Sequence, residues 1–232
     1  NAGQVCIAPD YLMVPEENIE EVISLAKDSI GAMYPSLLDN DQYTAMVNDR
    51  HYQRMQKNLD DALGHAEQVI SINPAGEDFA NNPLQKVAPT LIINPDDNAI
   101  CMQDEIFGPL LPIKTYQSFE DTINYINDRP RPLAAYYFGY DKTEEERFLT
   151  GTTSGGACVN DVMFHMLQKD LPFGGVGPSG MGAYHGIEGF KTFSHAKGIY
   201  RQPKKIPVAK LAGFMPPYGD ASEKSIKQKV KR

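Results

Sequence analysis

The first half of the chain alternates between short apolar runs and longer stretches in which apolar residues recur with the period of a helix. An apolar run at residues 11–14 precedes a helical repeat of apolar positions over residues 19–33. This pattern predicts a strand that leads into an amphipathic helix. The same spacing over residues 43–63 predicts a second helix, which we expect to end near Gly64 because glycine readily adopts the left-handed conformation that closes helices.

The middle of the chain continues this alternation. Residues 87–93 are apolar but contain Pro89. Because proline lacks the N–H that a strand donates, this segment is predicted to be an edge or irregular strand. Strands that alternate with helices indicate an α/β fold with a largely parallel sheet. The remaining predicted elements are strands at 68–72, 110–116 and 156–159, the last of them buried, an apolar run at 133–138, and helices at 118–126 and 143–149.

The texture of the sequence changes after Asn160. Glycines are dense over residues 174–189, and residues 193–200 are predicted to form a last strand. From Gln202 onward the chain contains proline and lysine without sustained periodicity. We therefore expect this tail to be an extended arm that needs another surface to order it.

Composition and charge narrow the class of protein. The chain of 232 residues is 41% hydrophobic, and 22 basic against 30 acidic residues give a formal charge of −8. These values are typical of a globular protein, and the negative balance disfavours a sequence-independent nucleic-acid partner or an anionic membrane. A small or neutral ligand fits this negative charge better than a polyanionic partner does.

The three cysteines suggest a reducing compartment. Cys6, Cys101 and Cys158 are unevenly placed and show no CxxC spacing, so neither a disulfide framework nor a zinc site is predicted. No apolar stretch reaches the roughly 18 residues that span a bilayer, and the first residues lack the build of a signal peptide. We expect a soluble, cytoplasmic protein.

A dinucleotide-binding pattern occurs in the wrong context. Residues 175–180, GVGPSG, match GxGxxG. That fingerprint needs a strand before it and a helix after it, so that helix N–H groups meet the pyrophosphate. The residues that follow, 181–186, are too rich in glycine for a helix. This segment is interpreted as a tight structural or substrate-side loop.

The opening residues NAGQVC allow two readings of Cys6. A free cysteine taken alone packs as a small, inert hydrophobic residue. Gly3, however, allows the backbone to approach a reacting carbon closely, and N–H groups in such a bend favour a thiolate and an oxyanion. A catalytic nucleophile is therefore a second candidate role.

The segment EIFGP places a carboxylate, an aromatic ring and a Gly-Pro bend directly before an apolar strand. General turn chemistry explains this segment as a loop that leads into the strand. The functional alternative is that Glu105 accepts hydrogen bonds from sugar hydroxyls while Phe107 flanks a planar ring.

Together these segments resemble the NAD(P)-dependent aldehyde dehydrogenase family from residue 1 to about residue 202. NAGQVC is similar to the family's nucleophile loop and EIFGP to its nicotinamide-ribose contact. GGACVND at 155–161 resembles its last catalytic-domain strand, and PFGGVGPSG at 172–180 its C-terminal signature. The order of these four motifs implies a catalytic domain over residues 1–192, with an oligomerisation strand and extended tail over residues 193–232.

Three shorter segments resemble the class 3 and coniferyl aldehyde dehydrogenase branch of this family. They are RPRPLA at 129–134, YHG at 184–186 and PPY at 216–218. His165 is similar to a histidine of that branch, and we expect it to be a hydrogen-bonded structural residue, as a lone histidine near an apolar run usually is.

The resemblance implies a mechanism. The Cys6 thiolate would attack an aldehyde, aromatic or of medium chain length, to give a thiohemiacetal; hydride would pass to NAD or NADP, and water would hydrolyse the resulting thioester. Glu105 would hold the nicotinamide ribose, Phe107 would border the ring, and the Cys6 N–H would supply half of an oxyanion hole. A homodimer or higher homo-oligomer is implied as well.

Other groups that the family uses have no counterpart in this sequence. The second oxyanion donor, an asparagine, the glutamate general base and the Rossmann-like coenzyme domain all lie, by the resemblance, before the nucleophile loop. The sequence thus resembles the catalytic domain of a longer enzyme, and we expect little dehydrogenase activity from this chain alone.

Two other functions remain open from the sequence. Cys6 could form an acyl-enzyme without a cofactor, which would make the protein a thiol esterase or acyl transferase. Alternatively, the chain could be a non-catalytic oligomerisation fragment whose last strand and tail mediate contacts between copies.

Overall fold

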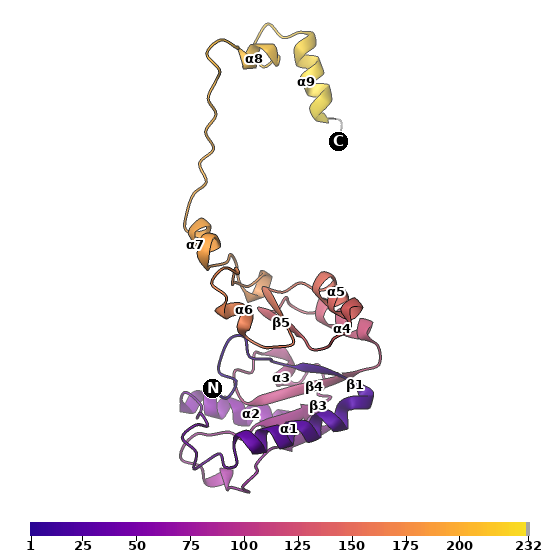
Figure 1. The fold of residues 1–232 in the computed structure, drawn as a ribbon, viewed down its shortest axis with the longest axis vertical. Coiled ribbons are helices and arrows are strands. Elements are labelled where there is room, and N and C mark those ends of the chain that lie inside the picture. The colour runs from indigo at the N-terminus through magenta and orange to yellow at the C-terminus, as the bar shows by residue number, and fades with distance from the viewer. Residues whose placement is uncertain (231–232) are drawn as a thin grey trace. The chain divides into compact units, whose positions relative to one another are not determined.

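A computed structural model describes residues 1–230 (Figure 1). The chain divides into two compact units, Asn1–Thr192 and a second unit that begins at Phe193. The strands of the first unit are β1 (Leu12–Pro15), β2 (Gln68–Ser71), β3 (Thr90–Ile93), β4 (Leu110–Tyr116), β5 (Ala134–Tyr137) and β6 (Gly156–Val159). Its α-helices are α1 (Ile19–Met33), α2 (Asp49–His65), α3 (Ile100–Gln103), α4 (Phe119–Asn127), α5 (Lys142–Gly151), α6 (Phe164–Leu167) and α7 (Gly186–Thr192). Short 3₁₀ turns are η1 (Glu16–Asn18), η2 (Phe79–Asn81) and η3 (Gly177–Ser179).

The main sheet has four strands in the order β1-β4-β3-β2. Strand β4 pairs in parallel with both β1 and β3, while β2 is antiparallel to β3 at the edge. The prediction of an α/β fold with a mostly parallel sheet is therefore confirmed. Strands β5 and β6 form a second, two-stranded parallel sheet.

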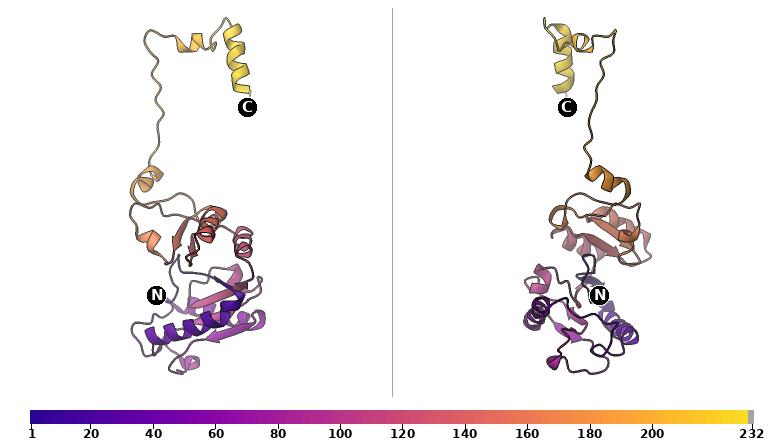
Figure 2. Two further views of the ribbon diagram at one scale, coloured as in Figure 1. Left: turned by 45° about the vertical axis from the view of Figure 1, so that its right-hand side comes forward. Right: turned by 90° about the vertical axis from the view of Figure 1, so that its left-hand side faces the viewer.

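Helices α1 and α2 cover opposite faces of the main sheet (Figure 2). Because successive strand residues point to opposite faces, Leu91 and Ile93 pack with Ile23 of α1. Ile92 instead packs with Met55 of α2, and both are fully buried. The loops at the ends of the central strands are therefore anchored to a rigid three-layer core.

Two predictions for the main sheet and its helices were wrong. Strand β3 is central and fully buried rather than an edge strand, because it begins at Thr90 and leaves Pro89 outside the ladder. Helix α2 begins at Asp49 rather than at residue 43, since the Asn48 side chain caps it by accepting a hydrogen bond from the His51 N–H at 3.0 Å. It continues through Gly64 to His65.

The small sheet packs on helices α4 and α5. Ile123, Tyr137 and Phe148 form its core. Strand β6 has the predicted bounds, but it is partly exposed rather than buried.

The second unit contains helices α8 (Val208–Leu211) and α9 (Asp220–Val230). The prediction of an extended arm was wrong for these segments, and residues 193–200 form no strand in the described chain. Among residues 1–230, no helix combines the length and the apolar composition that crossing a membrane requires.

Candidate active site

The first ten residues form a series of tight turns that presents Cys6 at the surface. The Gly3 N–H donates to the Asn1 Oδ1 at 3.1 Å, and the Val5 N–H donates to the Gly3 carbonyl at 2.9 Å. Cys6 is an exposed free thiol, whereas the next residue, Ile7, is buried at 1% exposure. The turn thus places an accessible sulfur directly beside an anchored residue.

The Gln4 side chain ties this loop to the segment before α2. Its amide nitrogen donates to the Ala45 carbonyl at 3.0 Å, and its oxygen accepts from the Val47 N–H at 2.9 Å. Both hydrogen bonds join residues more than forty positions apart in the sequence.

The backbone of Gly3 lies against the backbone of Gly108 in the EIFGP loop. A Cβ on Gly3 would stand 2.2 Å from the Gly108 carbonyl oxygen, and Gly3 has a φ of +70°. Only glycine fits this position. The close approach that we expected Gly3 to allow toward a substrate carbon is thus made to another loop.

Helix α2 holds the EIFGP loop from its other side. The Arg54 guanidinium donates to the Glu105 carbonyl at 2.8 Å and also to the Ile106 carbonyl. A Cβ on Gly108 would stand 2.1 Å from the Met55 sulfur. The loop is therefore enclosed between the turn that carries Cys6 and one turn of α2.

Asp10 makes the hydrogen bond that joins the two loops directly. Its Oδ1 accepts from the Ile106 N–H at 3.0 Å. Burial raises the pKa of Asp10 to about 6, with a further upward contribution from the Glu105 carboxylate; the Ile106 hydrogen bond and the Arg54 charge oppose this rise. A carboxyl group that titrates near pH 6 thus lies within the loop contact.

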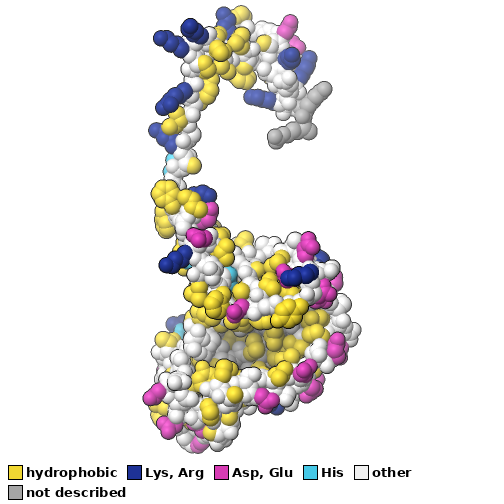
Figure 3. All heavy atoms as spheres, in the orientation of Figure 1, with side chains coloured by type: hydrophobic (Ala, Val, Ile, Leu, Met, Phe, Trp, Pro, Cys, Tyr) yellow, Lys and Arg dark blue, Asp and Glu magenta, His cyan; other side chains and the backbone are white. Residues whose placement is uncertain are grey.

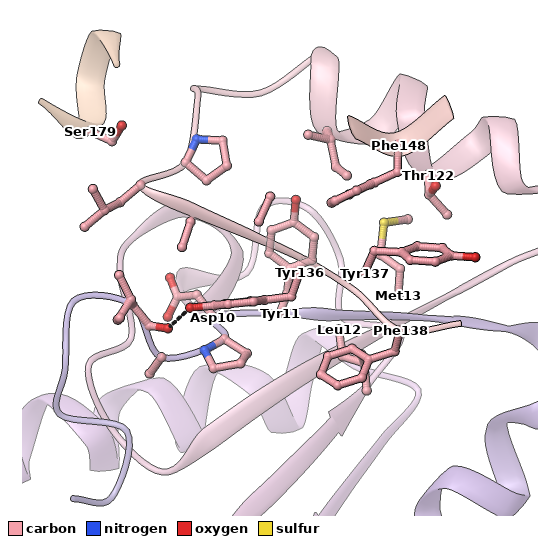
Figure 4. A pocket seen from close by; sticks show the side chains of 18 of the residues that line it. Asp10, Tyr11, Leu12, Met13, Thr122, Tyr136, Tyr137, Phe138, Phe148 and Ser179 are labelled. Atoms are coloured by element: carbon pink, nitrogen blue, oxygen red, sulfur yellow. Dashed lines mark hydrogen bonds between the residues drawn. The ribbon is translucent and has the colours of Figure 1, made fainter. Parts of the chain in front are cut away.

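Cys6 and Glu105 lie on the wall of one cavity of about 610 Å³ in the first unit. Figure 3 shows the hollow with apolar side chains along it, and Figure 4 shows the aromatic residues of β5 from close by. The Tyr136 hydroxyl donates to the Ile7 carbonyl at 2.6 Å, so β5 holds the residue that follows Cys6. The aromatic residues of the wall are Tyr11, Tyr116, Phe119, Tyr136, Tyr137, Phe138 and Phe148.

The other predicted site segments have different positions. Phe107 has a φ of +49° and does not line this cavity in the described chain. Pro178 and Ser179 of the GxGxxG segment do line it. Their segment forms the turn η3 rather than the start of a longer helix, in agreement with its interpretation as a loop.

His165 is not hydrogen-bonded as we predicted. It is buried at 7% exposure, and among the described residues neither ring nitrogen has a hydrogen-bond partner. Its ring lies 5.9 Å from that of Tyr136 and 6.0 Å from that of Phe173. Because burial lowers the pKa of His165, the ring is a neutral packing element.

Asp10, Arg54 and Tyr136 belong to the candidate site although the sequence reasoning did not select them. The sequence contained a signal for Asp10, because a carboxylate directly before the apolar run of β1 is a candidate for a site at the end of a strand. Arg54 offered none, because it lies on a polar helix face beside other charged residues. Within the described chain, no cluster of three or more metal-binding side chains occurs.

An accessible thiol and a carboxylate on an aromatic cavity, carried by loops of a mostly parallel sheet, are features of an α/β enzyme that works through a cysteine. The profile of the aldehyde dehydrogenase family matches residues 1–199. The chain belongs to this family.

Among its relatives are two coniferyl aldehyde dehydrogenases. The probable coniferyl aldehyde dehydrogenase of Caulobacter vibrioides is 47% identical over 232 residues, which are all of this chain and 48% of that protein. The coniferyl aldehyde dehydrogenase of Pseudomonas sp. strain HR199 is 51% identical over 95% of this chain and 46% of its own length. The likeness to the coniferyl branch is confirmed, and the chain spans about half the length of these curated relatives.

Solved structures show the same fold. The substrate-bound state of Staphylococcus aureus AldH superposes with a TM-score of 0.76 at 32% identity, covering 99% of this chain and 48% of that one. A double mutant of betaine aldehyde dehydrogenase from Staphylococcus aureus in complex with NAD⁺ gives 0.69 at 25% identity, covering 83% and 39%.

We predict that Gly3→Ala destabilises the protein by roughly 2 kcal/mol or more, because the new Cβ meets backbone and the residue must keep a positive φ. Gly64→Ala is the matched control. It lies in α2, and a Cβ added there would have no neighbouring atom within 4 Å, so alanine should be neutral or stabilise by up to about 1 kcal/mol. Urea unfolding of both variants measures the difference, and equal effects would contradict the loop contact.

The Asp10 carboxyl should make stability depend on pH. The folded protein retains this proton up to about pH 6, whereas the unfolded chain releases it near the ordinary aspartate pKa of 3.8, so its contribution to the free energy of unfolding falls as pH rises through that window. Relative to Asp10→Asn, the wild type should lose on the order of 2 kcal/mol between pH 4.5 and 7.5. Urea titrations at both pH values test this, and a constant difference would refute it.

Proposed function

We propose that this chain supplies the nucleophile and part of the coenzyme contact of an NAD(P)-dependent aldehyde dehydrogenase that oxidises an aromatic aldehyde, such as coniferyl aldehyde, to the carboxylic acid. The observation that carries the proposal is that Cys6 and Glu105, 99 positions apart, lie on one aromatic cavity. The names of the two coniferyl relatives support the substrate class. The three free cysteines fit action in a reducing cytoplasm.

Cys6 begins the reaction in this proposal. Its sulfur attacks the aldehyde carbon, a C–S bond forms, and the carbonyl electron pair moves to oxygen. Within the described chain the Cys6 N–H donates no hydrogen bond, so it is available to the developing oxyanion. The hydrogen bond from the Tyr136 hydroxyl to the Ile7 carbonyl holds the turn that carries the Cys6 N–H and sulfur.

The Glu105 carboxylate fits a role toward the ribose of a nicotinamide coenzyme. Arg54 donates to the backbone carbonyl of Glu105 and not to its carboxylate. No donor among residues 1–230 reaches the Glu105 side chain, so both carboxylate oxygens are free to accept from ribose hydroxyls. NAD or NADP, when bound, accepts the hydride that leaves the substrate carbon. A role for Phe107 beside the nicotinamide rests on the family resemblance, since that residue does not line the cavity.

Water then cleaves the thioester and returns the Cys6 thiol. The groups that activate this water lie, by the family resemblance, in the part of the relatives that this chain does not span. The proposal therefore assigns the complete reaction to a protein that contains both parts.

The test compares Cys6→Ala with Cys158→Ala in a protein that joins this chain to the remaining half of a coniferyl aldehyde dehydrogenase relative. We expect Cys6→Ala to lower the rate of coniferyl aldehyde oxidation by about 10³-fold or more, because the covalent step is lost. Cys158→Ala, on the partly exposed strand β6, should change it little. Reduction of NAD or NADP, followed by absorbance, measures both.

The same joined protein also tests the alternative function, that of a cofactor-independent thiol esterase. Hydrolysis of an activated ester at rates far above aldehyde oxidation, lost in Cys6→Ala and unaffected by NAD, would favour that alternative. Full aldehyde oxidation by Cys6→Ala would exclude both functions for this sulfur.

A further inference from the structure

The Gln4 side chain, two residues before Cys6, pairs with the chain as a strand neighbour would. Its amide nitrogen donates to the Ala45 carbonyl at 3.0 Å, and its amide oxygen accepts from the Val47 N–H at 2.9 Å. A residue of a parallel strand makes the same two bonds, because positions i and i+2 of its neighbour offer a carbonyl and an N–H on one edge. Gln4 thus makes with its side chain a contact that the backbone makes in a sheet.

Only an amide of this length can make both contacts. An amide carries N–H donors and a carbonyl acceptor, whereas a carboxylate only accepts and a thioether has no N–H to donate. The Gln4 Nε2 also donates to the Asn1 carbonyl at 3.2 Å, and the Gln4 backbone N–H donates to the same carbonyl at 3.0 Å. The Gln4 amide therefore holds the start of the turn as well as the segment on its far side.

Charged side chains hold the segment that receives Gln4. Residues 36–47 contain no helix or strand. The ammonium of Lys86, which is only 8% exposed, donates to three carbonyls of residues 37–40 at 2.8 to 3.0 Å. The Glu77 carboxylate accepts from the three N–H groups of residues 37–39 at 2.6 to 3.3 Å. Hydrogen bonds to charged groups are stronger than neutral ones, so this irregular segment is firmly held.

Residues 45–47, which Gln4 binds directly, are anchored to the core as well. The Met46 N–H donates to the Gln85 carbonyl at 3.0 Å. The Met46 side chain is buried at 4% exposure, in the apolar cluster that includes the inner face of α2. Gln4 therefore binds backbone whose position is fixed by the packed interior.

Gln4 is the third anchor of the turn that carries Cys6. The other two are the close packing of the Gly3 backbone and the hydrogen bond to the Ile7 carbonyl. Of residues 4–6, which lie between these two anchors, only the Gln4 side chain forms hydrogen bonds beyond the first ten residues of the described chain. The direction in which the Cys6 N–H and sulfur point thus depends on the Gln4 amide.

We propose that Gln4 is a positioning residue for Cys6: its amide fixes the turn so that the Cys6 N–H faces the oxygen of the carbonyl group that the sulfur attacks. This inference rests on the part of the proposed function that makes Cys6 a nucleophile toward a carbonyl carbon. It involves no coenzyme, so it can be tested in this chain alone.

The experiment compares two reactions of the Cys6 sulfur in the full chain, because only one of them forms an oxyanion. With 4-nitrophenyl acetate the sulfur attacks the ester carbonyl, the C–S bond forms, and nitrophenolate leaves with the electron pair of the C–O bond that breaks. With iodoacetamide the sulfur displaces iodide from a saturated carbon. Both reactions consume the thiolate, whose proton goes to solvent, so the ratio of their rate constants is independent of the thiolate fraction. Mass spectrometry of peptides separates Cys6 from Cys158.

The variant Gln4→Met keeps the length of the side chain and removes its hydrogen bonds. We expect the acylation rate constant of Cys6 to fall about tenfold or more, as it does when an oxyanion donor is lost, while alkylation changes by less than about twofold. Gln53→Met is the matched control, because Gln53 is an exposed glutamine of α2 outside the site. Both reactions should be unchanged in this control.

The variant Glu77→Gln tests the same set of contacts from the other end. It replaces one carboxylate oxygen by an NH₂ group, so at least one bond to residues 37–39 is lost. We expect the acylation-to-alkylation ratio of Cys6 to fall about threefold, but not to fall further in the Gln4→Met background, since the effect passes through Gln4. The urea midpoint should fall in both backgrounds, which separates positioning from stability. If circular dichroism shows that Gln4→Met does not fold, Glu77→Gln alone decides.

Three results would overturn the proposal. One is a Gln4→Met chain in which Cys6 is acylated as fast as in the wild type. Another is an equal loss of acylation and alkylation, which would assign Gln4 to the stability of the turn alone. The third is a wild-type Cys6 that is acylated no faster than Cys158, which would also remove the nucleophile from the proposed function; the first two results leave that function intact.

Discussion

The candidate site depends on a contact between two loops that are distant in the sequence. Gly3 lies so close to the Gly108 carbonyl that no other residue fits, and the Asp10 carboxylate binds the Ile106 N–H beside it. This contact holds the Cys6 turn against the loop that carries Glu105. The positions of the Cys6 and Glu105 loops thus depend on close backbone packing between Gly3 and Gly108. An added Cβ on Gly3 would clash there.

The rigid core explains why this contact persists. Helix α2 packs on the buried main sheet through Met55 and also binds the Glu105 loop through Arg54. Strand β5, from the other sheet, reaches the turn that carries Cys6 through Tyr136, whose hydroxyl binds the Ile7 carbonyl. Loops are usually more mobile than helices and strands. Here two sheets and one helix hold the loops in place, as a preorganised site requires.

Much of this arrangement could be predicted from the sequence, but its contacts could not. Strand β6 has its predicted bounds, and the motifs indicated Cys6 and Glu105, because period and motif are local signals. The hydrogen bonds of Asp10 and Tyr136 span 96 and 129 residues, and no local pattern encodes them. The prediction of an edge strand at Pro89 was wrong because a central strand tolerates a proline directly before its first residue, here Thr90.

Native-state hydrogen exchange of the Ile106 amide is the most direct measurement of the loop contact. If Asp10 joins the two loops, this amide is protected to a degree comparable with that of Ile92 in the central strand, and Asp10→Ala removes the protection. An Ile106 amide that exchanges as fast as an exposed turn in the wild type would show that the two loops are not held together.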